Sequence, residues 1–165
     1  MDKTVTIALA LAALVGCSPQ QHVEPQLTWR LSKEGVQVFD SLGKAQKLTI
    51  ALPGWVWASQ PYACPPDLAV GPRGEVLVTS NVLPVLWRID PKTFQVTVHR
   101  LALDADNDKD VGFSKIFYSA GEDAYIAVSA AHGSAWRIDP MLRAGQKVTI
   151  PESRRAPCGG SKEGR

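Results

Sequence analysis

The stretch WRIDP occurs twice in this chain, at Trp87–Pro91 and at Trp136–Pro140, 49 positions apart. Aligned backwards without gaps from these copies, EVLVTSNVLPVLWRIDP (75–91) meets AYIAVSAAHGSAWRIDP (124–140). In both copies, strand-forming residues fill the run before a turn. The final Asp-Pro is itself a turn signal, because Asp bonds the backbone ahead of it and Pro cannot extend a ladder. The match indicates one structural unit that the chain repeats.

Each unit contains four runs of strand-forming residues separated by turn residues. DLAV (67–70) and KIFYS (115–119) come before the aligned stretches, and the turns GPRG and AGED follow them. After each WRIDP comes a further run, QVTVHRLAL from Gln95 and QKVTI from Gln146. No convincing helical periodicity occurs after residue 16. We therefore expect an all-β domain built from successive antiparallel four-stranded sheets.

A unit of about 45 to 50 residues with four strands resembles one blade of a β-propeller. The pattern GPRGEVLVTSN…LWRIDP is most similar to NHL-type and related propellers, and the similarity runs from Asp67 to Ile150. VFDSLGKAQKLTIALPG (38–54) matches the end of a further unit, and LTWRLS (27–32) adds one more strand. The resemblance implies an incomplete propeller of about two and a half blades with about ten strands.

This number of blades falls short of a closed ring, which takes about four to eight, because each blade buries both faces between neighbours. Three arrangements remain open: an open arc or compact stack, a ring closed by several copies, or a shortened relative of a longer propeller. We expect the arc for the monomer. On the third strand of each unit, one face should pack on the neighbouring blade and the other should carry arginine: Trp87, Ile89, Trp136 and Ile138 on the first, Arg88 and Arg137 on the second.

The chain begins with MDKTVTIALALAALVG (1–16), whose apolar run is shorter than the ~20 residues that span a bilayer. Its length is typical of a signal-peptide core. The following Leu14–Cys17, LVGC, resembles the lipobox of bacterial lipoproteins, in which the peptide is cut before an acylated cysteine. The resemblance implies a signal peptide at 1–16, lipidation of Cys17 and a tether at 17–26. The alternative is an ordinary secretory signal.

Several acyl chains on one residue would anchor the protein firmly to a membrane, where a single chain binds only marginally. Ser18 follows the cysteine. By resemblance to lipoprotein sorting in Gram-negative bacteria, a residue other than Asp at this position favours the outer membrane. We therefore expect a protein of the cell envelope that faces the periplasm.

The rest of the chain divides into a domain at 27–151 and a tail at 152–165. The tail, ESRRAPCGGSKEGR, has very few apolar residues and predicts a flexible segment. The net charge of +2 lies in this tail, and the body is balanced. Because nucleic-acid binding needs a concentrated basic face, we expect no nucleic-acid partner.

With Cys17 set aside, two cysteines remain, Cys64 and Cys158. Export into an oxidising compartment favours a disulfide between them, which would join the tail to the domain. The alternative is that Cys158 stays unpaired in the flexible tail.

An acidic segment, DADNDKD (104–110), spaces carboxylates as in the opening of a calcium loop. Lys109 and Lys115 occupy the positions of the turn glycine and of the bidentate glutamate. A solvated loop is therefore the main interpretation, a calcium site is the alternative, and no other cofactor is expected. The candidate ligands are Asp104, Asp106, Asp108 and Asp110.

Aromatic residues gather in the connection GWVWASQPYACPP (54–66), which carries Trp55, Trp57 and Tyr62. Aromatic side chains on a loop are either packed under a sheet or offered to a partner. We expect inward packing. If the protein binds a glycan, a peptide or a flat organic ligand, this segment is the candidate site.

No catalytic signature stands out in the sequence. It contains no G-x-S-x-G elbow, no H-E-x-x-H, no P-loop and no G-x-G-x-x-G. His132 lies in AAHGS beside Ser129 and Ser134, and a Ser–His pair there is a minor alternative.

These observations favour a lipid-anchored envelope protein whose β-blade domain is a non-enzymatic binding or scaffold module. Its expected partners are the membrane, through the anchor, and a protein partner or a second copy, through blade edges. One alternative is a propeller-type hydrolase or lyase, similar to lactonases. Another is a truncated remnant of a longer propeller.

Overall fold

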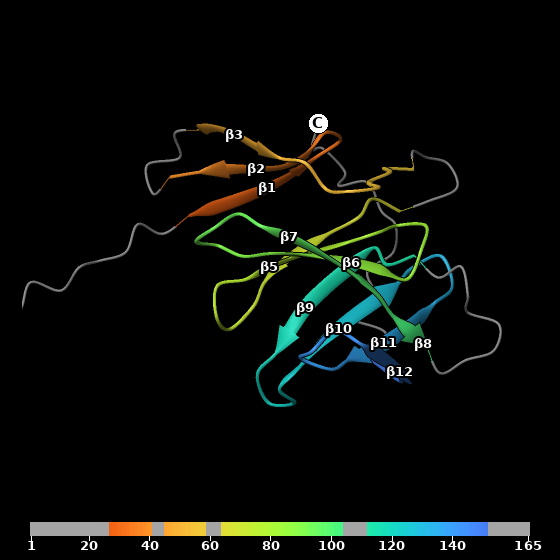
Figure 1. Ribbon diagram of the computed structural model, residues 1–165. Helices are drawn as coiled ribbons and strands as arrows, with labels where there is room; N and C mark the ends of the chain where they lie inside the picture. Colours follow the sequence, from red (N-terminus) through yellow and green to blue (C-terminus); the bar gives the residue numbers. More distant parts are fainter. Residues whose placement is uncertain (1–26, 41–44, 59–63, 104–111, 152–165) are drawn as a thin grey trace, which may run out of the picture.

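The computed structural model describes residues 27–40, 45–58, 64–103 and 112–151. Three β-sheets lie one over another in chain order, so that the second is sandwiched between the first and the third (Figure 1). Nearly all neighbouring strands are antiparallel, which confirms the predicted all-β class. In these four ranges no helix has the length and apolarity needed to cross a membrane.

The first sheet has the strand order β1-β2-β3 and the second has the order β4-β5-β6-β7. The strands of the first are β1 Thr28–Ser32, β2 Gly35–Phe39 and β3 Ala45–Ile50. Those of the second are β4 Leu68–Val70, β5 Val76–Thr79, β6 Val85–Ile89 and β7 Val96–Arg100.

The third sheet has the order β8-β12-β11-β10-β9. Its strands are β8 Ala102–Leu103, β9 Lys115–Ser119, β10 Ala124–Ser129, β11 Ser134–Ile138 and β12 Ala144–Val148. Each run predicted from the sequence contains a strand, including the one at 27–32.

The two WRIDP copies occupy equivalent positions in consecutive sheets. Trp87 of β6 pairs with Val78 of β5, and Trp136 of β11 pairs with Ala127 of β10. These two partners are themselves 49 positions apart, so the central hairpins of the second and third sheets share one register. The repeat in the sequence is therefore a repeat in the structure.

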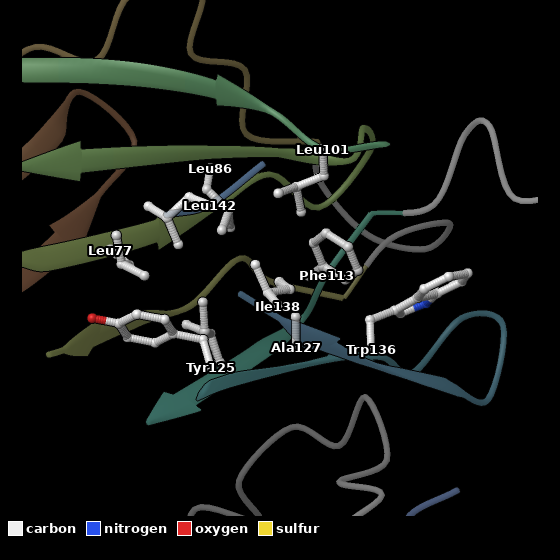
Figure 2. Packing of buried hydrophobic residues seen from close by; sticks show 10 residues of the cluster. Leu77, Leu86, Leu101, Phe113, Tyr125, Ala127, Trp136, Ile138 and Leu142 are labelled. Atoms are coloured by element: carbon white, nitrogen blue, oxygen red, sulfur yellow. The ribbon is translucent and has the colours of Figure 1, made fainter. Parts of the chain in front are cut away.

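Two apolar interfaces hold the sheets together. The first interface, between the first and second sheets, comprises Val36, Val38, Ile50, Leu52, Val76, Val78, Val85, Trp87 and Ile89. The second interface, between the second and third sheets, comprises Leu77, Leu86, Leu101, Phe113, Ile116, Tyr125, Ala127, Trp136, Ile138 and Leu142 (Figure 2). Neighbouring residues of β5 and β6 enter opposite interfaces, which explains why these strands read as unbroken apolar runs.

The predicted inward packing of the two tryptophans is confirmed, with exposed fractions of 3% for Trp87 and 0% for Trp136. Each packs toward the preceding sheet. Arg137, on the opposite face of β11, forms an ion pair with Glu122, with 3.6 Å between Nε and Oε2.

In both Asp-Pro turns the aspartate side chain accepts hydrogen bonds from the backbone ahead of it, as the sequence predicts. Asp90 Oδ1 accepts hydrogen bonds of 2.8 Å from the N–H groups two and three residues ahead. Asp139 accepts three such bonds from the following turn. Each turn also holds one residue in the left-handed region, Phe94 at φ 57° and Leu142 at φ 58°. Their side chains pack into the first and second interfaces, which offsets the backbone strain.

The prediction of one continuous strand from Gln95 to Leu103 is wrong. The chain leaves the second sheet after Arg100, buries Leu101 in the second interface and joins the third sheet as β8. There β8 pairs in parallel with β12, so the third sheet has five strands instead of four. The backbone bonds of Leu101 to Pro84 and of Ala102 to Arg143 fix this crossing.

Candidate functional site

A pocket of about 460 Å³ lies along β9, the edge strand of the third sheet. Among the described residues its lining is Lys115, Phe117, Tyr118 and Ser119. These four residues belong to one five-residue strand. It offers a cation, two aromatic rings and a hydroxyl within a short length of chain.

The position of β9 is fixed by a bond from the second sheet. Asp67, which directly precedes β4, accepts a hydrogen bond from Ile116 N–H at 3.0 Å from Oδ2. The backbone of Asp67 is itself held by Thr79, whose hydroxyl oxygen accepts its N–H at 2.8 Å. The carboxylate therefore ties the edge strand of the third sheet to the second.

Two tyrosines of neighbouring strands stack beside the pocket. The rings of Tyr118 and Tyr125 meet edge to face, with centroids 5.3 Å apart. Tyr118 donates its hydroxyl hydrogen to Asp123 over 2.6 Å at the surface. Tyr125 donates to Glu75 Oε1 over 2.9 Å inside the protein. Figure 2 shows the Tyr125 hydroxyl directed away from the apolar cluster.

Glu75 is buried, with an exposed fraction of 3%, and its carboxylate accepts several hydrogen bonds. Besides Tyr125, it accepts the backbone N–H of Arg73 at 2.9 Å and the Arg73 guanidinium at 3.3 Å. Burial raises the pKa of Glu75, but hydrogen bonds from its own backbone, Tyr125 and Arg73 outweigh burial, so the pKa is lowered overall. Burial and the Glu75 carboxylate together raise the pKa of Tyr125. In this pair Tyr125 is therefore a neutral phenol that donates a hydrogen bond to the anionic carboxylate of Glu75.

Because Gly71 has no side chain, the Tyr125 hydroxyl and the Glu75 carboxylate can lie next to its Cα atom. A Cβ atom on Gly71 would lie 2.0 Å from the Tyr125 hydroxyl oxygen and 2.7 Å from Glu75 Cδ. Since atoms cannot approach so closely, glycine in the turn before β5 is a packing requirement of the tyrosine one sheet away.

In the aromatic segment, for which inward packing was expected and a ligand site was the alternative, Trp55 and Trp57 are partly buried. Trp55 meets Trp87 edge to face with centroids 5.1 Å apart, and Trp57 continues the row at 6.2 Å. The Trp55 indole donates to Lys33 O over 3.1 Å. Of this segment, Val56 is the large apolar side chain most exposed, at 60%. The expected packing of Trp55 under the sheets is confirmed, whereas Tyr62 lies outside the described residues.

Asn81, in the loop between β5 and β6, forms hydrogen bonds with the aromatic segment at Ala58 and Cys64. Its Nδ2 donates to Ala58 O at 2.9 Å and to Cys64 O at 2.8 Å, and its Oδ1 accepts Ala58 N–H at 3.3 Å. Cys64 is buried and disulfide-bonded. Cys17 and Cys158 lie outside the described residues, so the predicted pairing of Cys64 with Cys158 stays a prediction.

The other predicted site residues are not brought together. His132 is exposed at its turn, whereas Ser129 and Ser134 are buried, and no hydrogen bond joins the histidine to either among the residues described. Burial, with a further contribution from Arg88, lowers the pKa of His99 on β7. The aspartates at 104–110 lie outside the described ranges, and within those ranges no cluster of three or more His, Cys, Asp or Glu could hold a metal ion.

Sequence reasoning did not single out the β9 pocket. KIFYS reads as an ordinary strand, and neither the open edge nor the neighbouring Tyr125 can be seen in it. The signal that was present is the pattern of Lys115, Phe117 and Ser119 at alternate positions, which places a cation, a ring and a hydroxyl on one face.

No family model matches this chain, and a search of curated proteins finds no match. Two solved structures of virginiamycin B lyase from Staphylococcus aureus align with this chain. A catalytically inactive variant with quinupristin aligns with a TM-score of 0.54 at 16% identity, over 81% of this chain and 44% of that one. A selenomethionine-substituted form aligns with a TM-score of 0.48 at 15% identity, over the same shares of each chain.

At this identity the first similarity concerns the fold alone, which is β-propeller-like. This chain spans less than half the length of the lyase chain that it matches.

Proposed function

We propose that this protein is a lipid-anchored protein of the bacterial cell envelope, and that its β-propeller-like domain is a non-enzymatic binding module whose ligand lies along β9. The anchor is Cys17, and the domain faces the periplasm from the outer membrane.

The lipobox-like LVGC at Leu14–Cys17 supports the anchor. The disulfide of Cys64 supports export, because disulfides persist in oxidising compartments such as the periplasm and are rare in the cytosol.

In this proposal the three sheets are successive blades of an open arc. The second and third sheets are full blades, since their central hairpins share one register, and the first sheet supplies the last three strands of a further blade. The two buried interfaces make the arc a rigid support. Binding residues placed on such a support keep their geometry, which is the usual basis of a recognition site.

The observation that carries the binding function is the pocket on an edge strand. Lys115, Phe117, Tyr118 and Ser119 line it, and they include a cation, two aromatic residues and a serine hydroxyl. A pocket that combines a few polar groups with aromatic walls fixes the orientation of a ligand and buries part of its surface.

Lipidation is tested by growing cells with a labelled fatty acid and comparing the natural chain with Cys17→Ser. We expect label in the natural chain, found in the membrane fraction, and none in the variant. Equal labelling of both, or none in either, would contradict the anchor.

Binding is tested by placing a photo-crosslinking phenylalanine analogue at position 117 and irradiating cells. The matched control carries the analogue at position 98, because Val98 is an exposed strand residue of β7 in the second sheet. We expect an adduct, identified by mass spectrometry, from position 117 and not from position 98. A folded, membrane-bound protein that gives no adduct at position 117 would refute the binding function.

A further inference from the structure

The open side of β9 determines what kind of ligand the pocket takes. In the described part of the third sheet, β9 pairs with β10 on one side and with no strand on the other. A strand edge carries N–H and C=O groups that can pair with another extended chain. Natural proteins usually block such edges by a bulge, a charge or a covering segment.

Asp67 blocks this edge at one point, where its carboxylate accepts Ile116 N–H. Alternate residues of an antiparallel strand direct their backbone groups to opposite sides. Tyr118, two residues on, therefore directs its N–H and C=O to the same side as Ile116 N–H, away from β10. Asp67 bonds Ile116, and among the described residues no strand pairs with Tyr118 on that side.

The described lining of the pocket also belongs to β9. We therefore place the ligand along this strand. A five-residue strand is about 17 Å long, the span of a peptide of similar length in an extended conformation. An extended peptide is the ligand that matches both the backbone groups and the shape.

The positive charge of Lys115 favours a peptide with a negatively charged side chain. Lys115 lines the pocket, and no described carboxylate forms an ion pair with it. A peptide with an acidic side chain opposite Lys115 complements this charge.

On these grounds, and resting on the proposed binding function, we propose that β9 binds an extended peptide carrying an acidic residue, which adds to the third sheet as a further strand. Backbone hydrogen bonds to Tyr118 provide affinity, and the ammonium of Lys115 selects for the acid.

The test uses the full chain and a fluorescent hexapeptide of alternating valine and threonine with one central glutamate, compared with the same peptide carrying lysine. By anisotropy we expect the glutamate peptide to bind the natural chain about tenfold more tightly than the lysine peptide, the ratio of one desolvated charge contact. Lys115→Glu should reverse this order, an outcome that a merely structural lysine would not give.

The backbone contact is tested with Tyr118→Pro, which removes the N–H on the open side and suits an edge strand. We expect this variant to lose binding and the matched control Val98→Pro, on the edge strand β7 of the second sheet, to retain it. Because Tyr118→Pro could misfold, hydrogen exchange of the Tyr118 amide in the natural chain provides the second measurement. The peptide should slow that exchange.

Equal binding of both peptides, or exchange at Tyr118 that the peptide leaves unchanged, would overturn the proposal. Concentration-dependent dimerisation blocked by Tyr118→Pro would overturn it in favour of a second copy as the occupant. If position 117 crosslinks to a molecule other than a polypeptide and the peptides do not bind, the peptide proposal fails and the binding function stands. If position 117 gives no adduct at all, the binding function itself fails.

Discussion

Replacing Tyr125 by phenylalanine removes one hydroxyl that joins the second and third sheets. That hydroxyl donates to Glu75 over 2.9 Å, and both residues are at most 3% exposed. A hydrogen bond to a charged group contributes about 1.5–3 kcal/mol, and the carboxylate keeps its bonds from Arg73. We therefore expect Tyr125→Phe to lower the free energy of unfolding at pH 7 by about 2 kcal/mol.

This loss should depend on pH in a defined direction. The pKa of Glu75 is lowered in the folded protein from its ordinary value of 4.5. A carboxyl group with a lowered folded pKa contributes stability above its unfolded pKa, and this stability disappears as the pH falls through the folded pKa. The difference between Tyr125→Phe and the natural chain should therefore shrink as the pH falls below 4.5.

The assay is urea unfolding followed by tryptophan fluorescence at pH 7 and at several values below the ordinary pKa of Glu75. Tyr118→Phe is the matched control, because it removes an even shorter tyrosine–carboxylate bond, 2.6 Å to Asp123, from an exposed site. Its unfolding midpoint should stay unchanged. If Tyr125→Phe costs less than ~0.5 kcal/mol at pH 7, below the range for a bond to a charged group, the account of the buried pair is wrong.

Three further substitutions test other contacts. Trp136→Ala leaves a cavity at a fully buried site in the second interface, so urea titrations should show a free energy of unfolding lower by about 3–5 kcal/mol. A loss of stability as small as that for an exposed residue would contradict the packing. Asp67→Ala removes the acceptor of Ile116 N–H, so hydrogen exchange of that amide should become at least about tenfold faster, and unchanged exchange would mean that the bond adds no protection. Asn81→Ala should speed exchange of the Ala58 amide while the global midpoint changes little, and exchange that stays slow would show that other contacts hold the segment.

The sequence predicted most of the strands because their signals are local. A strand buried on both faces, such as β5 or β10, is a continuous apolar run, and the turns around it carry Gly, Pro and Asp. The 49-residue repeat added what local signals lack, the equivalence of Trp87 and Trp136. The same reasoning could not find β8, which is two residues long and forms because burial of Leu101 turns the chain toward β12.

The candidate site was harder to predict because it depends on contacts between distant residues. Glu75 and Tyr125 are 50 positions apart, and neither carries a motif. Inward packing of Trp55 was expected, but the sequence could not identify its partner: Trp55 stacks on Trp87 and packs against the first interface. The β9 pocket becomes visible only when the order of the strands shows which edge is open.

Because the two central hairpins share one register, whole sheets can be gained or lost from this chain during evolution. Recombination between the copies, joining Leu86 directly to Trp136, would remove 49 residues and keep the tryptophan beside the same ladder position. The reverse exchange would insert one more sheet with its turns intact. Growth or shrinkage by whole sheets therefore needs a single genetic event, whereas any other spacing would shift the alternation of inward and outward side chains or leave a sheet incomplete.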